Sequence, residues 1–207
     1  MSESSLDLAV IGNGRTAALV EPSGRIVWWC LPRYDGDPVF CRLLAGDEEK
    51  GFTDVVLDGQ VESRSDYMRN TAIVVTELVD ANGGAVRITD FAPRFHHYGR
   101  TCRPPQLVRI IEPIAGMPRI TIRLRTTHHY GLPVTSYSSS SNSIRYWRDA
   151  VPVRLTTDAP LSYVENEASF VLTRPVHMVM GVDEPFEGAL DSTCRQFCDH
   201  TRDYWMD

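Results

Sequence analysis

The fold of this chain is decided by the stretch DLAVIGNGRTAALVEPSGRIVWW, residues 7–29. Gly12, Gly14 and Ala17 fit G-x-G-x-x-G/A, the pattern of a dinucleotide-binding loop. That loop needs a helix directly after its glycines, because the helix N-terminus holds the pyrophosphate. Here a Pro-Ser-Gly turn at 22–24 comes too soon for the helix of a βαβ unit. The stretch therefore predicts strands joined by glycine turns, and no cofactor.

Short strand patterns continue along most of the chain. Residues 69–93 hold two apolar runs around the Asn-Gly-Gly at 82–84, which predicts a β-hairpin. Within residues 119–127 apolar and polar side chains alternate, as in a strand with one buried face. Residues 106–114 are more continuously apolar, so we expect them to lie between two layers.

The last segment differs from the rest. From 186 to 207 the spacing is helical, and Leu190, Cys194 and Cys198 share one face. Strands followed by one helix indicate a mainly β protein, an antiparallel β-sandwich (super-sandwich) with a C-terminal linker helix. We assign residues 1–185 to the sandwich domain and 186–207 to the start of the linker. Cys194 and Cys198 are expected to pack, rather than to bind zinc or form a redox pair.

Composition and charge exclude several classes of protein. The chain has 207 residues and a net charge of -6, whereas nucleic acids and anionic membranes select a basic face. The chain has no apolar run long enough to cross a membrane. Its N-terminus lacks the basic head and apolar core of a secretory signal. Five cysteines, an odd number, do not indicate a disulfide framework, so we expect a cytoplasmic location.

Residues 9–44, AVIGNGRTAALVEPSGRIVWWCLPRYDGDPVFCRLL, resemble the opening of one known domain. It is the N-terminal domain of bacterial two-domain members of glycoside hydrolase family 15, which includes glucoamylase-like and trehalase-like enzymes. The shared pattern is an I-G-N/D start, T-A-A-L-V, a D/S-G turn and W-x-C-L-P-R-F-D. This chain has Tyr34 where Phe is usual, and Gly-Asp-Pro at 36–38 where Ser-Pro is common. Residues 88–94 resemble a later D-F-M-P segment, and residues 107–131 resemble a strand pair ending in a Tyr-Gly turn.

The resemblance implies a supporting role in a hydrolase of α-glucosidic bonds. In that family the β-sandwich is joined by a helical linker to an (α/α)-barrel, whose two glutamates carry out hydrolysis with inversion. The chain stops within the expected linker, so no catalytic residue is assigned. The implied partners are the catalytic barrel of the same polypeptide and, indirectly, the α-glucoside. The isolated domain is also expected to form a homodimer through its uncovered surface.

One polar and aromatic segment stands out as a candidate site at the substrate or at the domain interface. Its residues are Trp28, Trp29, Arg33, Tyr34, Asp35 and Asp37. Alternation along a strand places one of the two tryptophans in the core. The loop after it has two interpretations. Either it contacts sugar through an aromatic ring and charged groups, or an Arg33–Asp35 pair fixes the loop against the barrel.

Other chemistry-bearing residues are weaker candidates. Glu112 is expected to be the most buried carboxylate, with Arg109 or Arg119 as its partner. A further alternative is that the sandwich is itself a complete small glycosidase. It would then need a pocket with converging carboxylates. A stand-alone carbohydrate-binding module would instead need an exposed aromatic platform, including Trp28 or Trp147.

The paired histidines raise the question of a metal. The candidate ligands are His96, His97, His128 and His129, with Asp90 or Cys102. Adjacent histidines in a strand point to opposite faces, so each pair offers only one ligand to a common centre. No Cys-x-x-Cys or His-Glu-x-x-His spacing supports a site. We therefore predict no bound metal.

Overall fold

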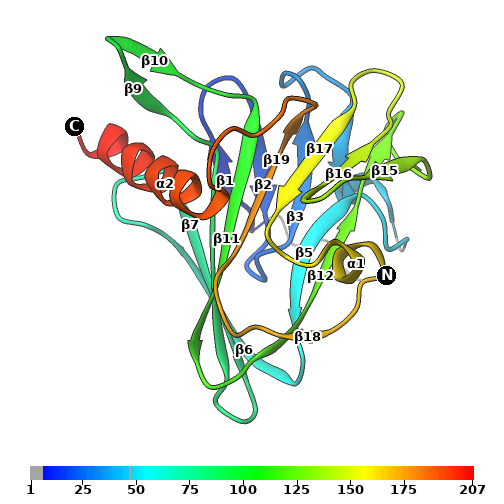
Figure 1. The fold of residues 1–207 in the computed structure, drawn as a ribbon, viewed down its shortest axis with the longest axis vertical. Helices are drawn as coiled ribbons and strands as arrows, with labels where there is room; N and C mark the ends of the chain where they lie inside the picture. The colour runs from blue at the N-terminus through cyan, green and yellow to red at the C-terminus, as the bar shows by residue number, and fades with distance from the viewer. Residues whose placement is uncertain (1–6, 47) are drawn as a thin grey trace.

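The computed structural model describes residues 7–46 and 48–207. Two antiparallel sheets stack face to face, and helix α2 (Leu190–Met206) lies against the outer side of one of them (Figure 1). Figure 1 also shows the β9–β10 hairpin (Phe95–His97 and Arg100–Cys102) projecting beyond the sheets beside the C-terminal part of α2. The predicted sandwich with a C-terminal helix is confirmed.

The opening stretch forms the edge of the first sheet. The strand order is β1-β2-β3-β5-β12-β18, and β4 pairs with β3. The bounds are β1 (Ala9–Gly12), β2 (Ala17–Val20), β3 (Ile26–Cys30), β4 (Pro38–Cys41), β5 (Phe52–Leu57), β12 (Arg119–Arg125) and β18 (Phe170–Val171). Gly14 and Gly24 have φ of 81° and 77° in the turns after β1 and β2, a conformation that favours glycine. The glycines turn strands, as predicted.

The second sheet has the order β15-β16-β17-β19-β11-β8-β7-β6. Its strands are β6 (Gln60–Tyr67), β7 (Val74–Asp80), β8 (Ala85–Phe91), β11 (Gln106–Ala115), β15 (Tyr137–Ser139), β16 (Ser143–Tyr146), β17 (Val153–Thr157) and β19 (Val176–Val182). The predicted hairpin is the turn between β7 and β8, where Gly83 has φ of 81°. The remaining elements are β13 (Thr127–His128), β14 (Leu132–Pro133), the 3-10 helix Arg42–Leu44 and α1 (Leu161–Glu165).

Strand β11 separates two apolar cores. Leu107 and Ile111 face the first sheet and belong to the main core of the sandwich. Val108 and Ile110 face the other way, into a second cluster closed by α2. The expectation that residues 106–114 lie between layers holds for 107–111, whereas 112 and 113 are half-buried and Ile114 is 40% exposed. Cys194 is fully buried in the second cluster and Cys198 packs against it, so both cysteines serve packing, as predicted.

A buried ion pair joins the two sheets. Arg109 donates to Asp90 through Nε at 2.7 Å and Nη2 at 3.0 Å, and both side chains are fully enclosed. Nη2 of Arg109 also donates to the Gly24 carbonyl of the first sheet at 2.6 Å. The prediction that Glu112 is the most buried carboxylate is wrong, because Glu112 lies on the opposite face of β11 and is only half-buried. Arg109 is committed to Asp90 across the β8–β11 pair.

The segments that carry the family resemblance meet in space. Asn13 is fully buried and donates to the carbonyls of Pro93 at 3.0 Å and Pro104 at 2.8 Å. Arg94 donates to the Asn13 carbonyl at 2.9 Å, and its guanidinium lies 4.7 Å from the ring centre of Tyr204 in α2. The opening turn, the segment after β8 and the C-terminal helix therefore support one another.

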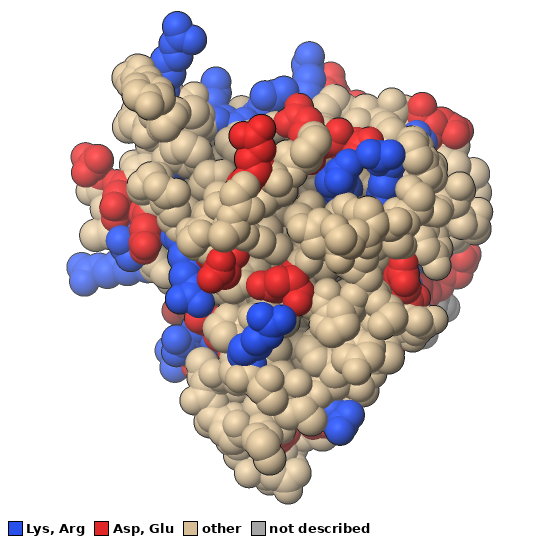
Figure 2. Space-filling model, viewed as in Figure 1, with Lys and Arg blue, Asp and Glu red and all other residues tan. Residues whose placement is uncertain are grey.

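Charge is distributed without a dominant patch on the face that Figure 2 draws. Basic and acidic side chains are interspersed over the upper and left parts of this face, and its lower part carries few charged groups. Among the described residues, no helix has both the length and the apolar character needed to span a bilayer.

Candidate functional site

The candidate loop begins where β3 leaves the core and ends at β4. It folds back so tightly that a Cβ on Gly36 would overlap the Leu31 carbonyl oxygen. Only glycine fits this position. The sequence Pro-Arg-Tyr-Asp at 32–35 is thus presented outward, while 38–41 returns to the sheet fully buried.

Asp37 anchors this loop to its neighbours. Its carboxylate accepts the backbone N–H groups of His129 at 2.9 Å and Tyr130 at 3.2 Å. It also pairs with Nη2 of Arg148 at 2.7 Å. A residue predicted to contact sugar or the barrel therefore has most of its hydrogen-bonding capacity used inside the domain.

Arg148 holds the base of the candidate loop, and sequence reasoning missed it. Its side chain is fully enclosed and donates to the carbonyls of Thr127 at 2.7 Å, Asp37 at 2.9 Å and Pro38 at 3.0 Å. Burial lowers the pKa of its guanidinium, and Asp37 opposes that effect. Arg148 thereby fastens three separate chain segments together. In the sequence, Arg148 is visible only as an arginine that follows the Arg-Tyr-Trp at 145–147, near the end of an expected strand.

The tip of the loop is exposed. Arg33 and Asp35 form an ion pair of 3.2 Å between Nε and Oδ1, with side chains 72% and 74% exposed. The expected Arg33–Asp35 pair is therefore present, although an exposed pair of this kind contributes little stability. Tyr34 between them is 55% exposed.

The two tryptophans have separate environments, as alternation predicts. Trp29 is fully buried, packs on Phe40 with ring centres 5.7 Å apart, and donates from Nε1 to Oγ1 of Thr16 at 2.9 Å. Trp28 is half-buried on the other face. Trp147, a candidate for an aromatic platform, is 44% exposed with the Arg145 guanidinium 5.1 Å from its ring centre. Of the six candidates, Arg33, Tyr34 and Asp35 gather at the surface, and Trp29 does not reach it.

The second histidine pair adjoins this loop in an unexpected geometry. His128 and His129 both approach Asp149, at 3.8 Å from Nδ1 and 2.6 Å from Nε2 respectively. The expectation that adjacent histidines diverge is wrong here, because β13 ends at His128 and His129 has φ of 47°. The hydrogen bond to His129 lowers the pKa of the exposed Asp149.

The other proposed ligands lie elsewhere. His96 packs on Tyr204 of α2 and His97 on Tyr98. Asp90 is held by Arg109 in the core, and Cys102 lies in the projecting hairpin. The structure does not gather these four residues around one centre.

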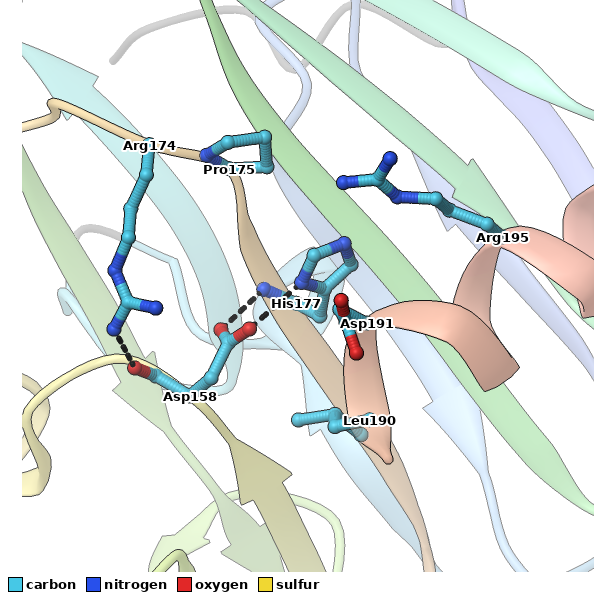
Figure 3. Close-up of a pocket in the computed structure, with 7 residues that line it drawn as sticks. All are labelled: Asp158, Arg174, Pro175, His177, Leu190, Asp191 and Arg195. Atoms are coloured by element: carbon cyan, nitrogen blue, oxygen red, sulfur yellow. Dashed lines mark hydrogen bonds and ion pairs between the residues drawn. The ribbon is translucent and has the colours of Figure 1, made fainter. Parts of the chain in front are cut away.

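A cavity lies where α2 meets the second sheet (Figure 3). This cavity of about 440 Å³ is lined by Asp158, Arg174, Pro175, His177, Leu190, Asp191 and Arg195. In this view the His177 ring lies between Arg174 on one side and Arg195 on the other. Asp158 accepts hydrogen bonds from the backbone nitrogen and from Nδ1 of His177, both at 2.7 Å. Burial tends to raise the pKa of Asp158, but these hydrogen bonds outweigh it and hold that pKa below its ordinary value.

Comparison with known proteins identifies the family. Residues 4–168 match the family described as trehalase-like, N-terminal. The match covers most of the chain, and the chain belongs to this family. The resemblance to trehalase-like N-terminal domains is thereby confirmed.

The relatives are much longer than this chain. A trehalase of Thermoplasma volcanium is 31% identical over 160 residues, which is 73% of this chain and 24% of that protein. Trehalase 2 of Sulfolobus acidocaldarius is 27% identical over 68% of this chain and 22% of its own length. A trehalase of Thermoplasma acidophilum is 32% identical over 54% of this chain and 19% of its own length. The chain thus spans about a quarter or less of these relatives. No solved structure shows a significant match.

Proposed function

We propose that this chain is the non-catalytic N-terminal domain of a glycoside hydrolase that acts on α-glucosidic bonds, with trehalose as the substrate of the longer polypeptide. The observation that carries the proposal is the family match over residues 4–168, together with relatives named trehalase of which the matched part makes up about a quarter or less. The catalytic (α/α)-barrel belongs to the same polypeptide in this proposal. Residues 186–207 begin the linker to it, and the whole is a member of glycoside hydrolase family 15.

The carboxyl groups of the core and of the candidate loop support a non-catalytic role. Inverting hydrolysis uses an acid of raised pKa and a base roughly 6.5–9.5 Å away from it. Burial raises the pKa of Asp90, but its side chain is fully enclosed and paired with Arg109, out of reach of a sugar. Asp35 and Asp37 of the candidate loop are engaged by Arg33 and Arg148.

The candidate loop is suited to the rim of a substrate pocket formed with the barrel. Its base is fastened by Asp37 and Arg148, while Arg33, Tyr34 and Asp35 project outward. A rigid base with an exposed aromatic ring and two charges positions contacts precisely without supplying a reacting group.

We also place the protein in the cytoplasm. All five cysteines are free, which suits a reducing compartment.

The test compares two polypeptides. The 207-residue chain and the product of the whole coding region are each incubated with trehalose, and glucose release is measured. We expect hydrolysis only by the longer product, and a raised KM for its Tyr34→Ala variant. Tyr98→Ala is the matched control, since Tyr98 is 92% exposed in the distant hairpin. Glucose release by the 207-residue chain, or a coding region that stops at Asp207, would overturn the proposal.

A carbohydrate-binding module is the second candidate, favoured by one cavity of about 280 Å³. Its lining includes Tyr137, Tyr146, Glu165 and Glu167, and Tyr137 is 51% exposed. An aromatic face beside carboxylates is a common arrangement for holding a sugar ring. Under this alternative the chain alone binds trehalose or glucose in calorimetry, and Tyr137→Ala abolishes binding. Absence of binding by the wild-type chain removes this candidate.

A further inference from the structure

Two imidazoles and one carboxylate converge beside the candidate loop. One ligand atom each from His128, His129 and Asp149 can be chosen so that all lie within 4.8 Å of one another. The ring centres of the two histidines are 4.7 Å apart. We propose that these three side chains form a binding site for a zinc-class divalent cation.

The site rests on a fixed frame. Arg148, the residue before Asp149, donates from Nε to the carbonyl of Thr127, the residue before His128, at 2.7 Å. Asp37 holds the backbone nitrogen of His129 at 2.9 Å. The two segments that carry the three side chains are therefore held side by side by a hydrogen bond that Arg148 donates and one that Asp37 accepts. Since Arg148 and Asp37 pair with each other, they leave little net charge to repel a cation.

His128 supplies a second, independent indication. Its Nδ1 is buried and has no hydrogen-bond partner within the part of the chain that the structure describes. A buried ring nitrogen without a partner is costly, and a metal ion satisfies it directly. Its nearest carboxylate oxygen, Oδ2 of Asp149, lies 3.8 Å away.

The ligand set selects the class of metal. Two histidine nitrogens and one carboxylate suit zinc and similar transition metals, whereas magnesium and calcium prefer oxygen ligands. Around a tetrahedral zinc the ligand atoms lie about 3.3 Å apart, given bonds of about 2.0–2.1 Å. The 2.6 Å contact of His129 must open and the 3.8 Å separation of His128 must close. His129 and Asp149 are 56% and 72% exposed, so side-chain rotation suffices.

Three protein ligands leave the fourth tetrahedral position to water or to a group from another domain. The site opens to solvent through Asp149, and it lies on the turn that Asp37 ties to the candidate loop. A bound ion would thus fasten the turn at 128–131 to the segment at 148–149 more firmly. This inference does not depend on the proposed function, because it concerns only residues of this chain.

The test measures metal binding directly. The chain is treated with EDTA, dialysed and titrated with ZnCl₂ by calorimetry, and Co²⁺ absorption reports the coordination geometry. We expect one ion per chain. His129→Gln and Asp149→Asn should each weaken binding by more than about 100-fold, because loss of even an outer partner costs about 10–100-fold.

The matched control is the other histidine pair. The double variant His96→Gln/His97→Gln should bind zinc as the wild type does, and circular dichroism verifies that every variant is folded. The proposal is overturned if the wild-type chain binds no zinc. It is equally overturned if His129→Gln and Asp149→Asn bind as tightly as wild type, or if only the control variant loses binding.

Discussion

Arg109 illustrates how a single charged residue can govern a β-sandwich. It is enclosed between the sheets and reaches Asp90 in its own sheet and Gly24 in the other. A buried charge that loses its partner is penalised heavily, whereas removing both charges of a pair is often tolerated. The effect of a substitution at Arg109 therefore depends on what stands at position 90.

We expect Arg109→Met to lower the free energy of unfolding by about 3–5 kcal/mol, because Asp90 is left in the core without its partner and must be buried as an unpaired charge or take up a proton. The double variant Asp90→Leu/Arg109→Met should recover a large part of that loss. Urea unfolding of the three proteins measures both effects. A double variant less stable than either single variant would contradict this expectation. It would mean that the ion pair stabilises the fold, rather than only offsetting the free energy lost when its two charges are buried.

Trp29 makes a second prediction at this scale. Since its side chain is fully buried against Phe40, Trp29→Ala should cost about 3–5 kcal/mol of unfolding free energy. Trp147→Ala, at a position 44% exposed, should cost less than about 1 kcal/mol. Thermal and urea unfolding compare the two variants. A loss below 1 kcal/mol for Trp29→Ala would contradict the buried position.

At the scale of elements, residues 7–29 and 69–93 show what sequence patterns can predict. Glycine turns and alternating apolar residues specify hairpins locally, so β1–β2–β3 and β7–β8 form as expected. Helix α1 was not predicted, since its span Leu161–Glu165 is too short for a helical period to register. The candidate site was predicted only in part, namely the Arg33–Asp35 pair and the placement of one tryptophan in the core. The convergence of Asp37, His129 and Arg148 depends on contacts between distant segments and on a left-handed turn, and neither leaves a periodic signal.

The Asp158–His177 contact ties the end of β17 to β19 and predicts an acid dependence. Because the folded pKa of Asp158 is lowered, its stabilising contribution is present above the unfolded pKa of about 3.9 and is lost as pH falls through the folded pKa. Asp158→Asn should therefore be less stable than wild type at pH 7 and should lose less stability on acidification. Asp191→Asn, on the rim of the same cavity, is the control and should keep the wild-type profile. Identical profiles for Asp158→Asn and wild type would refute this role.

Helix α2 protects its cysteines. Burial raises the pKa of Cys194 to about 12 and that of Cys198 to about 11, so little thiolate forms at pH 8. We expect iodoacetamide at pH 8 to modify the partly exposed Cys102 first, and both helix cysteines only in urea. Mass spectrometry of the digested protein locates the label. Equal labelling of Cys194 and Cys102 in the folded chain would mean that α2 detaches readily from the second sheet.

At the scale of the whole molecule, the exposed apolar residues around the candidate site suggest what the isolated domain does. Tyr34 in the candidate loop, Tyr130 in the turn after β13 and Leu132 in β14 are 55%, 59% and 55% exposed. Exposed apolar residues of this kind are suited to an interface with a neighbouring domain. Where that domain is absent, a second copy of this chain can cover them.

We expect the isolated chain to form a two-fold dimer that Leu132→Ser weakens. Light scattering after size exclusion at high protein concentration measures the mass. Met117→Ser is the control, since Met117 is 80% exposed on the separate turn between β11 and β12. A monomeric mass at the highest concentration would count against self-association.

The hydrogen bonds of Arg148 also limit how this domain can be re-engineered or can diversify. Because one side chain satisfies the carbonyls of Asp37, Pro38 and Thr127, a length change in any one of these loops removes acceptors fixed by the others. The segments around 37–38, 127 and 148 can therefore be exchanged between relatives only as a set. A chimaera that exchanged only the loop at 31–37 between two relatives would inherit mismatched geometry, whereas exchanging all three segments together would carry the arginine and its acceptors intact.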